Sequence, residues 1–429
     1  MHFKFWTSGL ILATALGLSA CGGGSSDGKT TQLRLLNASA AYSALDLSVN
    51  NANLNTNVAY GTVGSYGSVN TSATASEVQT NGVGAVVASL TPTLSASSNY
   101  TLIAYGWSGA VHTSLLQEAE AAADSGKSKL LVLNLAPDAG ALDVYVSTAN
   151  NNEDLSNFTP VAANIADGYS SGYNKLNSGN FRVTLTGAGQ PKDIRLDIPS
   201  LTLDSTGVSS LIVTATVGGH LVNAMHLKQQ GALTHIPNAL ARVRLAATLS
   251  GNASVSAKLG AGTVLPSLVA PQVGQYLGYN AGTQDLSLQV NGIPLSVSSA
   301  ALKAGGDYTL LVWGTPSAPQ LSVLSDDNHL PTSSSVAKIR MINGLASGAA
   351  GLNMTLDYST LASNVLPGTV SALSQVPASS SSLLTVSSPS VSTPVFGASG
   401  LVVPQGAVFS LFMMGDPAAP VGQLVRDDR

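Results

Sequence analysis

The stretch LRLLNASAAYSALDLSV, at Leu33–Val49, decides the fold. An apolar run comes first, a turn sequence follows around Asn37, and a run of alternating apolar and polar residues ends at Val49. Alternation with a period of two is typical of a strand that buries one face, and Asn and Ser favour turns because their side chains bond to nearby backbone groups. The stretch therefore predicts a strand, a turn and a second strand.

The same pattern returns three times along the chain. The copies read LLVLNLAPDAGALDVYV at Leu130–Val146, VRLAATLSGNASVSAKL from Val243 and IRMINGLASGAAGLNMTLDY from Ile339. With Asn37, Asn134, Ala247 and Asn343 as equivalent points, the spacings are 97, 113 and 96 residues. One unit, of a size typical of a single domain, is therefore used four times.

The units also end alike, with an apolar strand that closes on glycine. These late strands cover Tyr100–Gly106, Leu211–Gly218, Tyr308–Gly314 and Phe409–Gly415. Short strands bounded by turns, in units of about 100 residues, are typical of an antiparallel β-sandwich of immunoglobulin-like size. We predict an all-β chain of four tandem immunoglobulin-like antiparallel β-sandwich modules, at residues 31–127, 128–236, 237–334 and 335–429.

Each unit is long enough to form its own core, so we expect a string of domains rather than a solenoid. The last strand of the fourth module is expected to include Leu424 and Val425. Between modules 1 and 2, Gln117–Asp124 reads QEAEAAAD, which favours a helical turn ended by Gly126.

The first 20 residues have the pattern of a secretory signal peptide, with Lys4 followed by an apolar stretch and small residues before Cys21. That stretch is shorter than the ~18 residues that a membrane span requires. The ending LSAC resembles the lipobox of bacterial lipoproteins, which implies that Cys21 carries acyl chains such as palmitate. With Gly22 next, the resemblance implies a lipid-anchored protein of the bacterial outer membrane. Residues 21–30 would be the lipidated cysteine and a flexible Gly/Ser-rich tether.

Composition excludes several classes of protein. Charged residues make up 9% of the chain and apolar residues 44%, whereas a disordered chain is rich in charge and poor in apolar residues. The net charge of −4 offers no basic surface for phosphates, so we expect no nucleic-acid partner. Cys21 is the only cysteine of the sequence, which excludes intramolecular disulfides.

Three motifs suggest a family. They are VAYGTV at Val58–Val63, Y-x-L-x-x-Y-G at Tyr100–Gly106 and APDAGALDVYV at Ala136–Val146. These motifs are similar to the bacterial domain-of-unknown-function 4397 family, whose modules open with versions of VRVxNASPDAPxVDVYV. Modules 3 and 4 depart from the pattern, with Ser256 where Asp46 and Asp143 fall and with Gly344–Ala346 in place of the Ala-Ser-Pro step. The resemblance implies an extracytoplasmic β-sandwich with no established activity.

Catalytic candidates are sparse. Gly168–Gly172 reads GYSSG and fits the G-x-S-x-G motif of hydrolases, but the residues after it are turn-like, whereas that motif requires a following helix. The histidines His112, His220, His226, His235 and His329 are scattered. His220 and His226 could meet across a hairpin, although lone polar histidines are the simpler interpretation. We predict no enzyme activity, no catalytic residue and no cofactor.

Two oxygen-rich loops are candidate calcium sites. The first carries Glu153 and Asp154, and the second carries Asp326 and Asp327. Calcium takes six to eight oxygen ligands, but neither loop has the ligand spacing of an EF-hand. Solvated turns are the simpler interpretation.

Two further features recur or stand out. Asp46 and Asp143 lie inside equivalent strands, where an inward-facing acid must be hydrogen-bonded, so we predict that they are structural acceptors. Trp107 lies just beyond Gly106, and it either packs in a core or serves as an exposed anchor for a ligand.

These features together predict a lipid-anchored cell-envelope protein that binds an unknown protein or glycan through loops and strand edges. A purely structural spacer or surface-layer component is the alternative, and an envelope hydrolase is disfavoured. An exposed apolar patch would favour binding over spacing.

Overall fold

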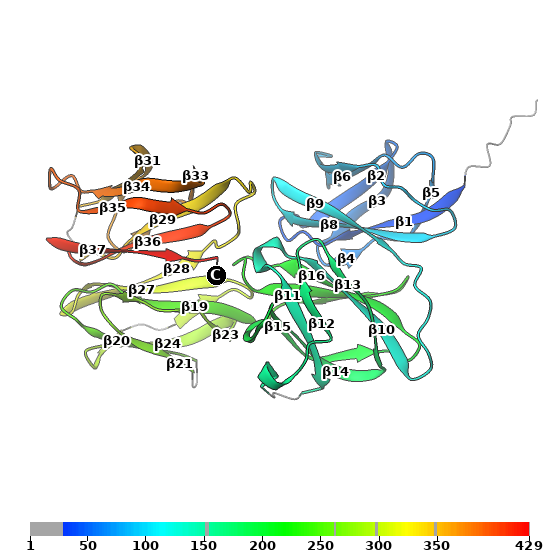
Figure 1. Cartoon of the computed structure of the whole chain (residues 1–429), viewed down its shortest axis with the longest axis horizontal. Coiled ribbons are helices and arrows are strands. Elements are labelled where there is room, and N and C mark those ends of the chain that lie inside the picture. Colours follow the sequence, from blue (N-terminus) through cyan, green and yellow to red (C-terminus); the bar gives the residue numbers. More distant parts are fainter. Residues whose placement is uncertain (1–28, 151–153, 261–262, 297–298, 347–349, 429) are drawn as a thin grey trace, which may run out of the picture.

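The computed structural model describes residues 29–428 apart from 151–153, 261–262, 297–298 and 347–349. These residues form strands and two single-turn 3-10 helices, η1 (Pro137–Ala139) and η2 (Leu155–Asn157). Eight sheets form four two-sheet modules, which lie as two pairs side by side (Figure 1). Within the described ranges, no helix is long and apolar enough to cross a membrane.

Modules 1 and 2 form the half of the molecule coloured blue to green in Figure 1. Module 1 consists of β1 (Thr30–Asn37), β2 (Ala44–Val49), β3 (Ala52–Ala59), β4 (Thr62–Val63), β5 (Gly67–Asn70), β6 (Ser76–Thr80), β7 (Val86–Leu90), β8 (Asn99–Trp107) and β9 (Ala110–Gln117). Module 2 consists of β10 (Lys127–Leu135), β11 (Leu142–Thr148), β12 (Ala162–Ile165), β13 (Ser170–Asn177), β14 (Gly179–Gly187), β15 (Gln190–Leu203), β16 (Val208–Ala215), β17 (Val222–Lys228) and β18 (Leu233–Ile236).

Modules 3 and 4 form the other half. Module 3 consists of β19 (Leu240–Ala247), β20 (Ser254–Leu259), β21 (Thr263–Val269), β22 (Gln272–Val273), β23 (Leu277–Asn280), β24 (Gly282–Val290), β25 (Ile293–Leu295), β26 (Ser299–Leu302), β27 (Asp307–Thr315) and β28 (Ala318–Asp326). Module 4 consists of β29 (Val336–Asn343), β30 (Leu352–Leu356), β31 (Ser359–Val365), β32 (Thr369–Val370), β33 (Ser374–Pro377), β34 (Ser379–Ser387), β35 (Phe396–Val403), β36 (Val408–Asp416) and β37 (Ala419–Arg426).

One strand pairing in each module is parallel. The first strand pairs in parallel with the late strand, as β1 with β8, β10 with β16, β19 with β27 and β29 with β36. The second strand of each module starts the opposite sheet, so the opening turn carries the chain across the sandwich. The predicted all-β sandwich is confirmed, and its sheets are antiparallel, as expected, apart from this one pair in each module. The parallel pair could not be foreseen, because a buried strand has the same apolar pattern whichever way its neighbour runs.

Each module encloses its own core between its two sheets. In module 1 the core contains Leu33 and Leu35 of β1 and Leu45 and Leu47 of β2, all from the opening stretch. The cores of modules 2, 3 and 4 are built from the equivalent strands. Alternation within the repeated motif therefore identifies the residues that face inward.

The asparagine at the centre of the motif ties the two sheets together. Asn37 is buried, and its Nδ2 donates to the carbonyl oxygens of Tyr42 at 3.2 Å and Val58 at 3.1 Å. Asn134 and Asn343 also donate to the carbonyl oxygen of a residue in the third strand of their modules. A buried amide is stable only when it is hydrogen-bonded, so this residue fixes the path of the opening turn.

The recurring aspartates of the second strand are structural acceptors, as predicted. Asp46 Oδ1 accepts from the backbone N–H of Asn57 at 2.6 Å, and Asp143 Oδ1 accepts from that of Asn164 at 2.8 Å. Both asparagines have left-handed φ angles, 54° and 53°. The carboxylates therefore hold a sharp local change of direction in the neighbouring strand.

The modules pack face to face in pairs. Leu36 and Ile103 of module 1 pack with Leu133 and Ile212 of module 2 in one buried apolar cluster. A second cluster joins modules 3 and 4 through Ala246, Leu311, Ile342, Phe412 and Met414. The chain is thus folded back on itself, an arrangement on which the sequence made no prediction.

The linker between modules 1 and 2 corrects an expectation. Gln117–Asp124 forms no helical turn, because β9 ends at Gln117 and the next residues follow an irregular path. Glu118 is buried, and its carboxylate contacts Arg34 and the backbone N–H of Gln230. These tertiary contacts override the local helix propensity.

Candidate functional site

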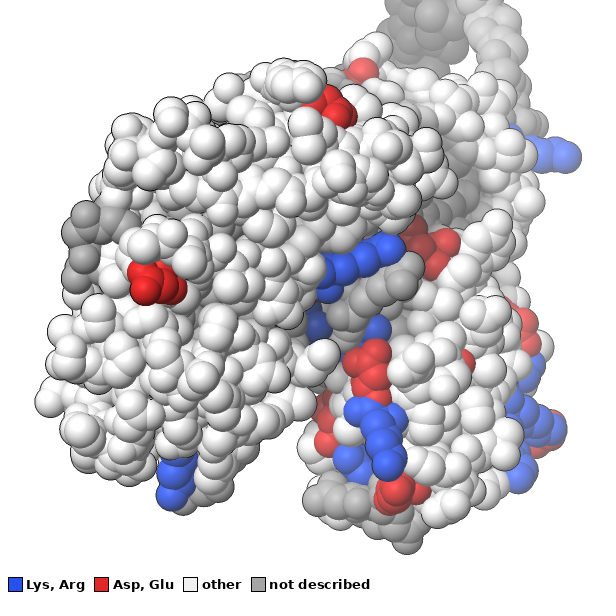
Figure 2. Space-filling model, turned by 60° about the vertical axis from the view of Figure 1, so that its left-hand side comes forward, with Lys and Arg blue, Asp and Glu red and all other residues white. Residues whose placement is uncertain are grey.

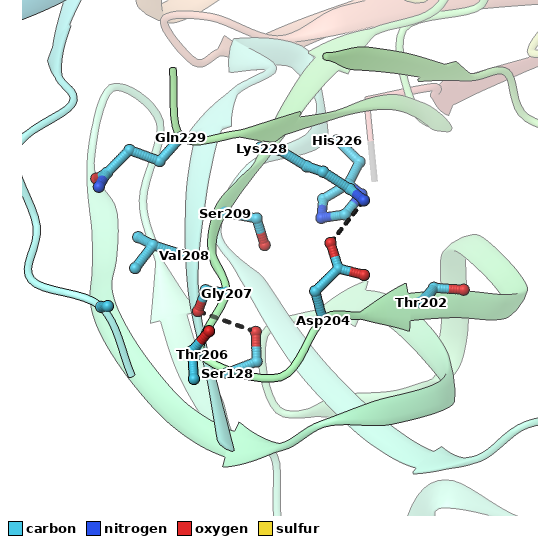
Figure 3. Close-up of a pocket in the computed structure, with 11 residues that line it drawn as sticks. Ser128, Thr202, Asp204, Thr206, Gly207, Val208, Ser209, His226, Lys228 and Gln229 are labelled. Carbon is cyan, nitrogen blue, oxygen red and sulfur yellow. Dashed lines mark hydrogen bonds and ion pairs between the residues drawn. The ribbon is translucent and has the colours of Figure 1, made fainter. Parts of the chain in front are cut away.

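Three of the cavities that the described residues form lie at the ends of modules or where modules meet. One of about 250 Å³ lies at an end of module 2, beside His226 and Asp204 (Figure 3). Another of about 570 Å³ lies at an end of module 4, against the turn at Pro417–Pro420. A hollow of about 360 Å³ opens where modules 2, 3 and 4 meet, and Arg242 and Asp427 are among its lining residues. Pockets for drug-sized ligands span roughly 300–1,000 Å³.

Three buried arginines occupy one equivalent position of the first strand. Arg34, Arg244 and Arg340 are 5%, 1% and 3% exposed. The Nε of each donates to a hydroxyl of the adjacent late strand, Thr101 at 2.9 Å, Thr309 at 2.8 Å and Ser410 at 2.8 Å. A buried guanidinium is destabilising unless a carboxylate pairs with it.

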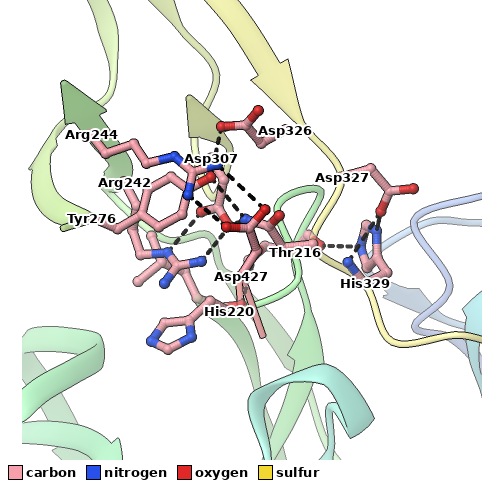
Figure 4. A network of polar contacts seen from close by, with 12 residues as sticks. Thr216, His220, Arg242, Arg244, Tyr276, Asp307, Asp326, Asp327, His329 and Asp427 are labelled. Atoms are coloured by element: carbon pink, nitrogen blue, oxygen red, sulfur yellow. Dashed lines mark hydrogen bonds and ion pairs between the residues drawn. The ribbon is translucent and has the colours of Figure 1, made fainter. Parts of the chain in front are cut away.

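In modules 3 and 4, the carboxylate that pairs with the buried arginine of one module comes from the other module. Arg244 of module 3 binds Asp427, which follows β37 of module 4, with 2.6 Å between Nη1 and Oδ1. Arg340 of module 4 binds Asp326 of module 3, with 2.8 Å between Nη2 and Oδ1. In module 1, Arg34 binds Glu118 of its own module. Buried reciprocal ion pairs therefore lock modules 3 and 4 together, and Figure 4 shows Arg244 and Asp427 of the first pair.

A partly buried tyrosine completes this cluster. The guanidinium carbons of Arg242 and Arg244 lie 4.6 and 4.3 Å from the centroid of the Tyr276 ring, within the range of cation–π attraction. The Tyr276 hydroxyl donates to Asp326 Oδ2 at 2.7 Å. Burial raises the pKa of Tyr276 well above its usual value, so it stays a neutral hydrogen-bond donor.

A second set of charged residues lines the hollow between modules 2 and 3, with Arg242 in module 3 and Asp193 and His220 in module 2. Arg242 Nε donates to Asp307 Oδ1 at 2.8 Å, and Asn328 donates to the other carboxylate oxygen. Burial raises the pKa of Asp307 despite these partners. In module 2, Asp193 accepts from Arg195 and contacts His220 Nε2 at 3.1 Å.

The ion pair of Asp193 and the neutral state of His220 follow from their surroundings. Burial alone would raise the pKa of Asp193, but hydrogen bonds from His220 and Arg195 outweigh it and hold that pKa well below its usual range. Burial lowers the pKa of His220 to about 4. These groups neutralise one another, so we assign them a structural role at the joint between modules.

Residues of all four modules and their linkers meet at His329. Its Nδ1 lies 2.6 Å from Asp327 Oδ1 and its Nε2 lies 2.8 Å from the carbonyl oxygen of Thr216 in module 2. The Trp107 ring of module 1 lies 4.1 Å from the His329 ring, between centroids. Asp138 of module 2 accepts from Trp107 Nε1 at 3.2 Å and from the backbone N–H of Leu330 at 2.7 Å.

His329 is expected to make this joint depend on pH. Both ring nitrogens face acceptors, and only the doubly protonated imidazolium can donate to both. Burial lowers the pKa of His329, but its contacts with Asp327 and Asp138 outweigh that effect and raise the pKa above its usual value. Because the pKa of His329 is higher in the folded than in the unfolded state, its protonated ring contributes its full stabilisation below about pH 6.5. That contribution is lost as the pH rises through the pKa of His329 in the folded protein.

The measurement is the difference in unfolding free energy between wild type and His329→Gln from pH 5 to 9. We expect this difference to shrink as the pH rises. The glutamine variant removes the titrating group but leaves Asp327, Asp138 and Lys338 in place, so their own titrations cancel in the difference. A difference that grows with pH would show that the neutral imidazole is the stabilising form.

Most candidate ligands of calcium are already engaged. Asp154 accepts from the backbone N–H of Ser156 and caps η2, whereas Glu153 lies outside the described residues. Asp326 is paired with Arg340, and Asp327 with His329. The two neighbouring aspartates thus pair with different side chains. The described residues contain no group of three or more His, Cys, Asp or Glu that could hold a metal ion.

The other candidates from the sequence fall at separate places. Cys21 lies outside the described residues. Trp107 is half-buried at the His329 joint, with its indole N–H bonded to Asp138, which favours a structural role over that of an exposed anchor. His220 binds Asp193, whereas His226 lines the cavity of module 2.

The GYSSG motif lacks the setting of a nucleophile elbow. Ser170 is the first residue of strand β13, and no helix follows it, although the elbow requires a strand-to-helix turn. The backbone N–H of Gly168 donates to Asn134 O, which places the motif on the ordinary turn of the repeat. This geometry supports the interpretation from the sequence.

The buried arginines are the residues that sequence reasoning missed. The sequence did contain a signal for them. One arginine recurs at the same position of an apolar run in modules 1, 3 and 4, which read LRLLN, VRLAA and IRMIN, whereas module 2 reads LLVLN and has none. A lone charge that recurs within a buried strand indicates a buried partner. Which acid pairs with which arginine depends on how the modules pack, and local sequence does not encode that.

Three comparisons relate the chain to known proteins. A family model described as "Domain of unknown function (DUF4397)" matches residues 31–145 and 241–350. No curated protein matches the chain. A crystal structure from Bacteroides uniformis, described as "a putative cell adhesion protein", is similar at 11% identity over 47% of this chain and 99% of that chain, with a TM-score of 0.21. So low a TM-score supports no argument about fold or function.

The family match covers the openings of all four modules and both halves of the molecule. Its second region includes module 3, where Ser256 departs from the motif. The matched residues together make up just over half of the sequence, and so the chain belongs to the DUF4397 family of domains of unknown function.

Proposed function

We propose that this protein is a lipid-anchored recognition protein of the bacterial outer membrane that binds a partner through its loops and strand edges. The observation that carries the proposal is the compact packing of the four modules. A spacer gains reach when its modules touch little, whereas here apolar clusters and buried ion pairs fold the chain back on itself. A body whose modules pack tightly together is better suited to present a surface than to span a distance.

The surface of modules 3 and 4 supports binding over spacing. Figure 2 turns these modules forward and shows few charged side chains over their outer face, while charges gather at the hollow between the halves. The exposed large apolar residues of these modules are Val264, Val269, Leu277, Ile293, Val323, Tyr358, Leu366, Val391, Val402 and Val421. The cores of interaction surfaces are depleted of charged residues, as this outer face is.

No residue set of the described chain supports an enzyme. The buried acids Glu118, Asp307, Asp326 and Asp427 are paired with buried arginines, and the one hydrolase-like motif has the wrong setting. A catalytic acid, base and nucleophile must converge on one cavity, and none of the cavities above brings such a set together.

Binding is tested with labelled protein from Gly22 onward on cells of the bacterium that encodes it. We expect saturable binding that unlabelled protein displaces. The variant Ile293→Lys/Tyr358→Lys, which charges two residues that are 71% and 88% exposed, should weaken it. Val83→Lys is the matched control, because Val83 is 87% exposed but lies in module 1. Absence of saturable binding would favour the structural spacer.

Lipid anchoring is tested separately by Cys21→Ser. Several acyl chains on one residue give stable membrane attachment, since each buried CH₂ contributes roughly 0.8 kcal/mol. The wild-type protein should partition into detergent with membranes, and the variant should be found in the aqueous phase. A variant that stays in the membrane fraction would place the anchor elsewhere.

A further inference from the structure

One end of the module 2 core is polar where the other three cores are apolar. Strand pairing identifies equivalent positions in the four modules. In each module we compare the late-strand residue that pairs with the same position of the first strand. These pairs are Leu33 with Tyr100, Leu130 with Ser209, Val243 with Tyr308 and Ile339 with Phe409. Serine thus stands in module 2 where each of the other modules has a buried aromatic residue.

The aromatic residues fill and close the end of the sandwich. The Tyr100 hydroxyl accepts from the backbone N–H of Ser95 at 3.0 Å, and the Tyr308 hydroxyl accepts from that of Lys303 at 2.7 Å. Each ring therefore spans the space between the late strand and the turn before it. Ser209 has no ring to span that space.

A second position in the same place has also become polar. His226 pairs with Leu211 of the late strand, as Leu115 pairs with Leu102, Val323 with Leu310 and Leu424 with Leu411. The other modules thus have aliphatic residues at this position. His226 is only 6% exposed, and its Nε2 has no hydrogen-bond partner among the described residues.

These two replacements open the cavity of about 250 Å³ shown in Figure 3. Its lining includes the side chains of Ser128, Ser209, Thr206 and His226. At its mouth Lys228 Nζ binds Asp204 Oδ2 at 2.6 Å, and both side chains are about half exposed. The cavity is therefore polar and carries no net charge.

The polar lining destabilises module 2 and has no structural compensation. A buried imidazole nitrogen without a partner retains its desolvation penalty, and the missing ring removes apolar contacts. Modules 1 and 4 show that this fold can fill the same space with an aromatic and an aliphatic side chain. Departures from good packing of this kind are typical of functional sites.

We propose that the cavity of module 2 binds a small neutral polyol of monosaccharide size. Its volume lies below the roughly 300 Å³ at which pockets for drug-sized ligands begin. Hydroxyl groups and an imidazole supply both donors and acceptors, which match the hydroxyl groups of a sugar. This site goes beyond the proposed function, because it stands whether or not the chain is anchored and whichever surface binds a partner.

The charge state of the lining supports a neutral ligand. Burial lowers the pKa of His226, so its imidazole is neutral at pH 7. Lys228 is already paired with Asp204. An anion would find no unpaired cation in the lining described above, whereas a hydroxyl group can donate to His226 Nε2 or accept from it.

The test uses the chain from Gly22 onward, which keeps every residue that the structure describes, with isotope-labelled histidine rings. The chain has few histidines, so each ring signal can be followed by NMR. The probes are D-glucose, D-galactose, N-acetyl-D-glucosamine, glycerol and inorganic phosphate. We expect at least one sugar to shift the His226 signal saturably, with a Kd on the order of 1 mM, while His112 and His329 stay unmoved.

Two variants restore the residues of the other modules. Ser209→Tyr reproduces Tyr100 and Tyr308, and His226→Leu reproduces Leu115 and Leu424. Both should raise the melting temperature of module 2, because they refill the core. Ser209→Tyr should abolish the sugar-induced shift of His226, and His226→Leu should abolish sugar binding measured by calorimetry.

Several results would overturn the proposal. One is sugar binding that survives Ser209→Tyr or His226→Leu, which would place the sugar elsewhere. Another is a His226 signal that phosphate shifts and sugars do not, which would make the ligand an anion. A third is a His226 signal that none of the probes moves at concentrations far above the expected Kd, which would mean that the cavity holds only solvent.

Discussion

Removal of Val421–Arg429 is expected to unfold module 4 and to weaken module 3. The deletion removes most of β37, which pairs with β36, and with it Leu424 of the module 4 core and Val425 of the apolar cluster between modules 3 and 4. Each buried apolar side chain contributes roughly 1.5–3 kcal/mol. The deletion also removes Asp427, and an uncompensated buried charge costs about 3–5 kcal/mol. Domains are stable by only about 5–15 kcal/mol.

Limited proteolysis followed by mass spectrometry measures the effect. We expect the truncated protein to lose modules 3 and 4 and to leave a resistant fragment that ends near Asn238. Asp416→Ala is the matched control, because it alters an exposed residue of the same β36–β37 hairpin. If modules 3 and 4 resist digestion as well as they do in the control, β37 adds little stability and the exchange of ion pairs is not needed.

Asp326→Ala is expected to lower the unfolding free energy of modules 3 and 4 by about 3–5 kcal/mol. The Asp326 side chain is fully buried and accepts hydrogen bonds from Arg340, Thr309 and Tyr276. Its loss leaves the Arg340 guanidinium buried, with Asp427 Oδ2 at 3.6 Å as its nearest remaining carboxylate. A lower urea midpoint measures the loss.

Two controls separate the possible causes of that loss. Asp285→Ala changes an exposed aspartate of module 3 and should stay within about 0.5 kcal/mol of wild type. The double variant Asp326→Leu/Arg340→Met should regain most of the stability, since apolar residues can replace a buried ion pair. If calcium raises the wild-type midpoint and Asp326→Ala abolishes that rise, Asp326 is a calcium ligand after all.

The fold of each module could be predicted from the sequence because its determinants are local. The alternation in Leu33–Val49 marks the inward faces, and the turn around Asn37 connects the two sheets. Both signals recur along the chain, so the interpretation of one module could be tested against the sequences of the other modules. Leu424 and Val425 were likewise placed in the final strand by comparison with module 3, and both lie in β37.

The arrangement of the modules could not be predicted, because it depends on contacts between distant residues. Leu36 and Ile342 have the same apolar character as core residues, and nothing in the sequence shows that they face another module. Asp326 lay in a loop rich in oxygen atoms, which suggested a metal. Its actual partner is Arg340. The two residues meet only because the sheet of module 3 that contains its first strand faces the corresponding sheet of module 4.

The exchange of carboxylates between modules 3 and 4 also bears on the order in which the modules fold. Arg34 meets its acid within 84 residues, so module 1 can complete its buried ion pair without the C-terminal half of the chain. Arg244 waits 183 residues for Asp427. Until Asp427 is in place, module 3 holds an uncompensated guanidinium and cannot reach its final stability. Modules 3 and 4 are therefore expected to mature as one cooperative unit, after modules 1 and 2 are already folded.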